Sequence, residues 1–86
     1  MQVRISDFKR DVKNTRKGYF TLVVDGLLVK KCVAHKHPGG KVWFAPPAIQ
    51  TPEGRYENVV CFEASAANDE AQTKVAELLR PHLQGL

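Results

Sequence analysis

Short apolar segments separated by turn residues occupy the first two thirds of the chain. Residues 19–24 and 27–34 are rich in aromatic and β-branched side chains, and Asp25-Gly26 stands between them. An Asp-Gly pair in this setting is typical of a two-residue type I′ hairpin, because both turn positions need a positive φ. The pattern therefore predicts an antiparallel hairpin with Val24 opposite Leu27.

Proline and glycine mark two further turns. The sequence HPGG at 37–40 places proline second and glycine third, which predicts a type II turn leading into a strand at 42–45. The sequence TPEG at 51–54 places proline second and glycine fourth, which predicts a type I turn before a strand at 56–63. Residues 2–12 alternate less regularly, and we expect one more strand there.

The apolar period changes from two to about 3.6 residues from Asn68 onward, which is typical of an amphipathic helix. Its apolar stripe contains Ala71, Val75, Leu78, Leu79 and Leu83. Ser65 or Asn68 can cap the helix, and the acidic residues 69–70 would complement the positive end of its dipole. Pro81 is expected to end or kink the helix near Leu79. We expect a single α+β domain over residues 1–86, with an antiparallel sheet of about five short strands in hairpins followed by one C-terminal amphipathic helix.

The predicted hairpin register assigns its side chains to two faces of the sheet. Because opposed residues share a face, one face should form the core under the helix with Phe20, Leu22, Val24, Leu27 and Val29. The other face should carry Tyr19, Thr21, Val23, Leu28, Lys30 and Cys32. This second face is too apolar for water alone, and one helix cannot cover both faces. We therefore infer a homodimer, the commonest closed arrangement.

The net charge of +4 conceals two halves of opposite sign. Residues 1–43 carry ten Lys and Arg against three Asp, a net +7, whereas residues 44–86 carry three Lys and Arg against six Asp and Glu, a net −3. A polarised small protein of this kind is suited to bind a polyanion, although the acidic half could equally attract the basic half of another copy.

Basic residues concentrate at 9–17, next to aromatic side chains. This combination lets a protein follow phosphates while bases stack on aromatic rings, although such clusters are also ordinary solubilising surface. Phe20 is assigned to the core, which leaves Tyr19 as the stacking residue, beside Lys30. The predicted nucleic-acid contacts in this half are Lys9, Arg10, Lys13, Arg16, Lys17, Tyr19 and Lys30.

Motifs for other chemistries are weak or missing. Cys32, His35 and His37 are possible metal ligands, as are Cys61 and His82, but they lack paired C-x-x-C spacing, and a strand would point Cys32 and His35 to opposite faces. Neither a nucleophile elbow nor a glycine-rich phosphate loop occurs. We therefore expect no catalytic residue, metal, cofactor or small-molecule substrate.

The sequence also bears on location. No apolar run approaches the roughly 20 residues that a membrane-spanning helix needs, and the first residues lack a secretory signal pattern. We therefore expect a cytoplasmic protein without membrane association, in which the two cysteines are small buried hydrophobes.

Residues 42–60, VWFAPPAIQTPEGRYENVV, resemble the most characteristic segment of the bacterial stage V sporulation protein G family. The positions that match in order and spacing are Ala45, Pro47, Thr51, Pro52, Glu53, Gly54 and Tyr56. The resemblance extends to the opening strand at 3–8, to residues 22–25 and to the closing helix. It implies a small α+β protein that pairs its sheets in a homodimer and acts as a cytosolic, non-catalytic nucleic-acid-binding regulator.

One departure from the family concerns the nucleic-acid contact. Members often carry a Lys-Arg pair just before the T-P-[DE]-G turn, where this chain has Ile49 and Gln50. The resemblance therefore implies contacts at Gln50, Thr51 and Arg55. The function expected from the sequence is a dimeric DNA- or RNA-binding regulator, and the alternative is a protein–protein interaction module that uses the second sheet face and the acidic helix.

Overall fold

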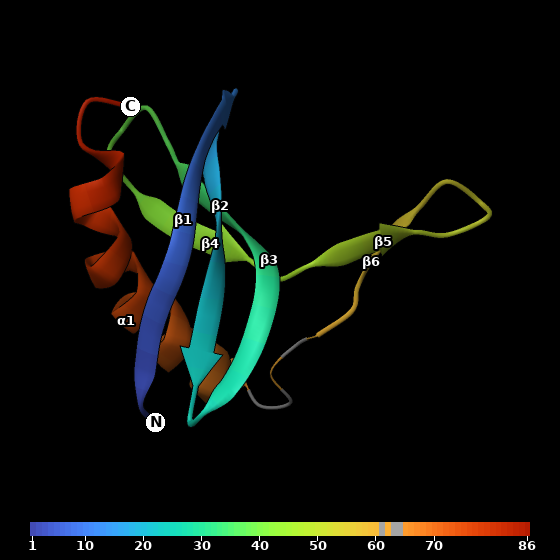
Figure 1. Ribbon diagram of the computed structural model, residues 1–86. Coiled ribbons are helices and arrows are strands. Elements are labelled where there is room, and N and C mark those ends of the chain that lie inside the picture. The colour runs from blue at the N-terminus through green and yellow to red at the C-terminus, as the bar shows by residue number, and fades with distance from the viewer. Residues whose placement is uncertain (61, 63–64) are drawn as a thin grey trace.

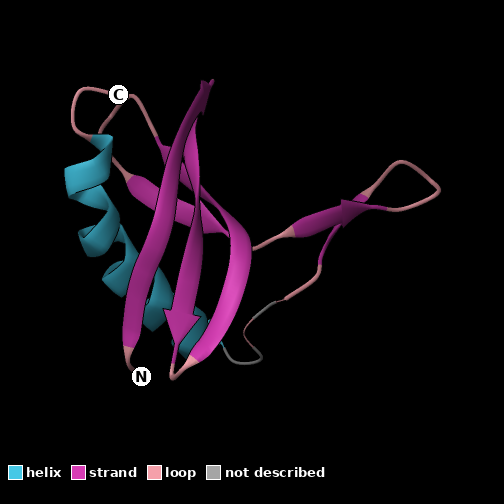
Figure 2. Cartoon of the chain, in the orientation of Figure 1, coloured by secondary structure: helices cyan, strands magenta, loops and turns pink. Residues whose placement is uncertain are grey.

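The computed structural model describes residues 1–60, 62 and 65–86 and confirms the expected α+β fold (Figures 1 and 2). Its elements are β1 (Val3–Lys13), β2 (Arg16–Val24), β3 (Leu27–Lys36), β4 (Val42–Ala45), β5 (Ala48–Gln50), β6 (Tyr56–Asn58) and α1 (Ser65–Leu83). Strands β1 to β4 form one antiparallel sheet in chain order, and β5 and β6 form a separate two-stranded ribbon. We call residues 48–58 the arm, because Figure 1 shows this ribbon projecting away from the sheet and the helix.

The turns agree with the sequence except at HPGG. Asp25 and Gly26 have φ of 48° and 84°, so the type I′ hairpin and the opposition of Val24 to Leu27 are confirmed. The TPEG turn also closes as predicted, with a 2.9 Å hydrogen bond from the last to the first residue of 51–54. The type II prediction for 37–40 is wrong. The positive φ, 99°, lies at Gly40, after a turn in which Gly40 donates to the carbonyl oxygen of His37 at 2.8 Å, as in a type I turn closed by a left-handed glycine.

The strand predicted at 56–63 ends at Asn58, since β6 pairs only with the short β5, and Glu63 lies outside the described residues.

A β-bulge in β3 changes the predicted register of the central hairpin. Val29 lies opposite Leu22 as expected, but Phe20 lies opposite Cys32, because Lys31 is an extra residue with φ of 62°. The bulge moves Cys32 to the helix side of the sheet, where it is fully buried, so its predicted place on the second face is wrong.

The core lies between the sheet and α1, as predicted. Its buried residues are Phe20, Leu22, Val29, Cys32, Ala34, Val42 and Phe44 from the sheet and Ala71, Val75, Ala76, Leu79 and Leu83 from the helix. Complete burial of each large side chain contributes about 1.5–3 kcal/mol. Two predicted core residues lie elsewhere. Leu27 is 65% exposed at the hairpin tip, and Leu78 is 37% exposed because Ala76 faces the sheet instead.

Helix α1 is longer at both ends than predicted. It begins at Ser65, so Asn68 is not its cap and its first turn contains no acidic residue. Pro81 does not end it near Leu79. The helix continues to Leu83, since a proline in the last turn removes only one late hydrogen bond.

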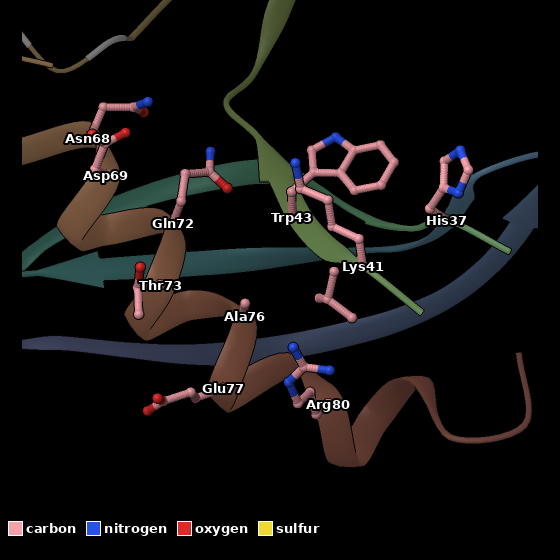
Figure 3. A pocket seen from close by; sticks show the side chains of 11 residues that line it. His37, Lys41, Trp43, Asn68, Asp69, Gln72, Thr73, Ala76, Glu77 and Arg80 are labelled. Atoms are coloured by element: carbon pink, nitrogen blue, oxygen red, sulfur yellow. The ribbon is translucent and has the colours of Figure 1, made fainter. Parts of the chain in front are cut away.

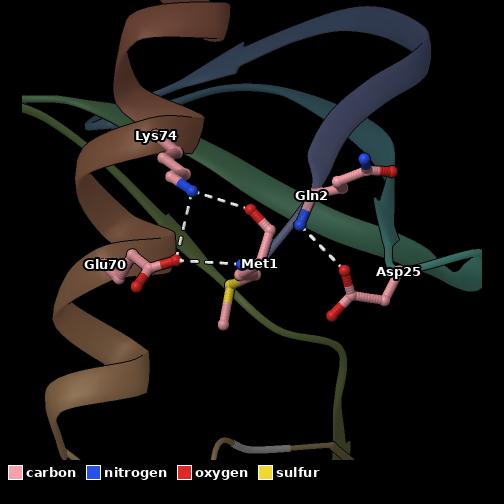
Figure 4. Close-up of polar contacts among 5 residues, drawn as sticks. All are labelled: Met1, Gln2, Asp25, Glu70 and Lys74. Atoms are coloured by element: carbon pink, nitrogen blue, oxygen red, sulfur yellow. Dashed lines mark hydrogen bonds and ion pairs between the residues drawn. The ribbon is translucent and has the colours of Figure 1, made fainter.

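Polar contacts tie the start of β1 to α1 and to the central hairpin (Figure 4). The Glu70 carboxylate lies 3.6 Å from the amino group of Met1 and 3.1 Å from Lys74 Nζ, which also donates to the Met1 carbonyl oxygen at 2.7 Å. The hydrogen bond from Lys74, followed by its charge and that of the amino group, lowers the pKa of Glu70. On the other side, the backbone N–H of Gln2 donates to Asp25 Oδ1 at 2.8 Å.

Candidate nucleic-acid interface

The sheet surface that faces away from α1 is called here the open face. Side chains directly opposed in adjacent strands share a face, so the ladder assigns its members. On β1 and β2 the opposed pairs are Arg4 and Val23, Ser6 and Thr21, Lys9 and Tyr19, and Lys13 and Arg16. Across β3 and β4 they are Leu28 opposite Val23, His35 opposite Arg16 and Trp43, and Val33 opposite Ala45. Lys30 follows the core residue Val29 and therefore belongs to the open face by strand alternation.

Tyr19, His35 and Trp43 form an aromatic row across the open face. The His35 and Trp43 rings stack with centroids 5.1 Å apart and an interplanar angle of 9°. The Arg16 guanidinium lies 5.3 Å from the centroid of the Tyr19 ring. Arg16 stands opposite His35 in the ladder, so it connects Tyr19 to the stacked pair.

Polar contacts position His35 and Arg16 on the open face. His35 Nδ1 lies 3.0 Å from the Thr15 hydroxyl, and burial, followed by the charge of Arg16, lowers the pKa of His35. The lowered pKa favours the neutral imidazole, the form that stacks on an indole without carrying charge. Arg16 pairs with the Asp11 carboxylate at 3.0 Å, which fixes the guanidinium near Tyr19.

The basic residues predicted as contacts divide between the open face and other positions. Lys9, Lys13, Arg16 and Lys30 lie on the open face, as does Tyr19. Arg10 lies opposite Gly18 on the helix side. Lys17 occupies a bulge and donates from Nζ to the Asn14 carbonyl oxygen at 2.8 Å. Within the described residues, the open-face cations that form no ion pair are Arg4, Lys9, Lys13 and Lys30.

The contacts expected in the TPEG region lie on the arm and are not brought to the open face. Gln50 Nε2 donates to the Gly54 carbonyl oxygen at 3.3 Å, and Thr51 Oγ1 accepts from the Arg55 backbone N–H at 3.2 Å. Both polar side chains therefore stabilise the turn itself. Arg55 is exposed in the loop that connects β5 to β6, and Figure 1 shows this loop at the end of the arm far from the sheet.

Apolar exposure differs from the expectation for the second sheet face. Thr21 and Val23 are only 7% and 5% exposed in the single chain, and Cys32 is not on this face. The most exposed large apolar side chains lie at the hairpin tip, where Leu28 of this face is 55% exposed, and on or just after the arm: Ile49 at 58%, Tyr56 at 74% and Val59 at 59%. An apolar partner would therefore cover more exposed apolar surface on the arm than at the centre of the open face.

Sequence reasoning missed three of the cationic and aromatic residues of the open face: Arg4, His35 and Trp43. A signal for the aromatic pair was available, because a hairpin closed by HPGG brings the residues on either side of it into register. Alternation in β4 with Val42 and Phe44 inward then places Trp43 outward, opposite His35.

The potential metal ligands do not converge. Cys32 and His35 point to opposite faces, as predicted, and Cys61 lies outside the described residues. In the part of the chain that the structure describes, no three His, Cys, Asp or Glu side chains cluster as a metal site. Burial raises the pKa of the Cys32 thiol to about 11, so this sulfur is not a thiolate at pH 7. Helix α1, in the described part of the chain, is not apolar enough over its length to cross a bilayer.

No protein-family model, curated protein or solved structure matches the chain.

Proposed function

We propose that this protein is a small, non-catalytic regulator that binds DNA or RNA as a homodimer, with the open face as its nucleic-acid surface. One observation carries the proposal: the aromatic row of Tyr19, His35 and Trp43, which spans β2, β3 and β4, shares the open face with cations of β1 and β3 that form no ion pair within the described residues. Phosphates would contact the cations while bases stack on the rings, the combination by which sheets bind single strands. The resemblance of residues 42–60 to the stage V sporulation protein G family supports the same function.

The arm supports the dimeric part of the proposal. Its exposed Ile49 and Tyr56 would be removed from water by a second copy, and a two-stranded ribbon gains stability when another surface covers it. Residues 48–58 carry one Arg against two Glu, so the arm is slightly acidic and is not repelled by the basic half of another chain. Because the arm projects away from the sheet (Figure 1), a dimer built through it does not require the open faces as its interface.

Titration of labelled single-stranded and duplex oligonucleotides at two ionic strengths tests the proposal. We expect salt-sensitive binding, because each phosphate contact releases a counterion. Tyr19→Ala should weaken binding to single strands by about 1–3 kcal/mol if a base stacks there. Absence of salt-sensitive binding at micromolar protein would refute the proposal. A loss with Tyr19→Ala that is no larger than that with Val12→Ala, an exposed apolar β1 residue that is not a member of the aromatic row, would refute the stacking role.

A protein–protein interaction module is the second candidate, and the apolar exposure of the arm favours it. An Ile49→Asp/Tyr56→Asp variant distinguishes the two functions when sedimentation velocity and oligonucleotide binding are measured together. If the variant is monomeric and keeps its affinity per chain, the arm serves assembly and the open face serves nucleic acid. If wild-type protein binds no oligonucleotide while the variant loses self-association, the interaction module is the better description.

A further inference from the structure

A groove of about 750 Å³ separates α1 from β4 and the turn that precedes it (Figure 3). This volume lies within the range of small-molecule sites. Lys41 and Trp43 line it on the strand side, and Thr73, Ala76 and Arg80 line it on the helix side. The groove is therefore a mixed surface, with one large aromatic ring, a small apolar patch and hydrogen-bonding groups.

At the centre of β4, the backbone groups that face this groove are already hydrogen-bonded, so an added strand cannot pair with them. The Gln72 carboxamide accepts from the Phe44 backbone N–H at 3.0 Å and donates to the Phe44 carbonyl oxygen at 2.8 Å. These are the two groups through which an added peptide strand would bind. An occupant of the groove must therefore be held by side chains.

Charge is unevenly distributed along the groove. His37, Lys41 and Arg80 lie at one end, and Asp69 lies at the other end of the helical wall. Arg80 and Thr73 are seven residues apart on α1, so the cationic end and the Thr73 hydroxyl are about 10 Å apart along the axis. Glu77 also lines the groove, but Figure 3 shows its side chain directed away from Lys41 and Trp43. A molecule with one anionic group and a flat polar ring fits this distribution, because Asp69 disfavours a second anionic group beyond Thr73.

Trp43 joins the groove to the open face. It stacks on His35 as part of the aromatic row and also forms part of the groove wall. A strand that crosses the open face would therefore reach the groove without leaving the aromatic row.

We propose that the groove binds one nucleotide of a single strand, which rests on the proposed function and extends it. The base packs against Trp43 with its polar edge toward Thr73, and the 5′-phosphate contacts Lys41 and Arg80. Duplex nucleic acid cannot use this site without unpairing a base, so the groove gives the protein a preference for single strands.

The single tryptophan of the chain reports on the site directly. Titration with adenosine 5′-monophosphate should quench the Trp43 fluorescence with saturation, adenosine should do so more weakly, and inorganic phosphate should leave it unchanged. Lys41→Ala/Arg80→Ala should raise the Kd for the nucleotide by at least about tenfold, because charge-assisted hydrogen bonds to phosphate are lost. The matched control is Arg10→Ala/Lys17→Ala, which removes the same charge outside both the groove and the open face and should leave the nucleotide Kd unchanged.

The outcomes separate the groove from the proposed function. If the nucleotide gives no saturable quenching while oligonucleotides bind, the groove proposal is overturned and the proposed function stands. Equal weakening of nucleotide binding by both double variants also overturns the groove proposal. The affinity would then depend on net charge and not on contacts inside the groove. If the nucleotide binds and no oligonucleotide does, the groove is supported and the proposed function is overturned. If neither binds, both are overturned.

Discussion

Removal of two cations from the open face should flatten the salt dependence of nucleic-acid binding by a calculable amount. Lys9 and Lys13 lie on this face, and neither forms an ion pair within the described residues. Each neutralised phosphate contributes about −0.7 to the slope of log K against log salt on single strands and about −0.9 on duplex DNA. The variant Lys9→Ala/Lys13→Ala should therefore flatten the slope by about 1.4 on single strands and about 1.8 on duplex DNA.

The same strands offer a control of equal charge. Arg10→Ala/Lys17→Ala also removes two cations, but Arg10 lies on the helix side of the sheet and the Lys17 amino group donates a hydrogen bond to the Asn14 carbonyl oxygen. Fluorescence anisotropy with a labelled oligonucleotide between about 50 and 200 mM salt measures both slopes. We expect the control to change the slope much less than the open-face variant. Equal flattening by the two variants would refute the reasoning, because net charge would then matter and position would not.

Three further predictions concern stability and are measured by urea or thermal unfolding. Gly18→Ala should cost about 1–3 kcal/mol, because the new Cβ would collide with the Lys9 carbonyl oxygen and lie 2.8 Å from the Phe8 ring, whereas Gly39→Ala, whose nearest neighbour is 3.8 Å away, should cost little. Gln72→Ala should cost about 1–3 kcal/mol through loss of its two hydrogen bonds to Phe44, and a loss below the error of measurement would show that water replaces them. Burial lowers the pKa of His35 from 6.5, so the unfolded state binds more protons and stability should fall as the pH decreases below about 6.5; His35→Asn should remove that part of the pH dependence, and an unchanged profile would contradict this cause.

Local sequence signals predicted most of the hairpins and the cover of the sheet by the helix. The Asp25-Gly26 turn was predictable because few residue pairs adopt two positive φ angles. The bulge at Lys31 was not, since lysine has no preference for φ of 62° and the bulge is held by burial of Cys32 on one side and of Phe20 and Leu22 on the other. One extra residue reversed the face of Cys32, one of the six residues that the predicted register had assigned to the second face.

The candidate site was partly predictable for a similar reason. Lys9, Lys13, Arg16 and Tyr19 share a face only because irregularities in both strands shift the ladder twice between β1 and β2. Composition indicated a basic segment but could not separate Arg10 from its neighbours. The groove beside Trp43 depends on how α1 lies against β4, which is a tertiary property without a local signal.

The arm has a thermodynamic consequence of its own. Its two three-residue strands pair with each other, and Ile49 and Tyr56 remain 58% and 74% exposed. Such a ladder opens with little loss of buried area, so its amide protons should exchange with deuterated solvent long before those of the central hairpin. Slowed exchange confined to residues 48–58 would therefore identify when a binding event covers this ribbon, whatever the bound molecule is.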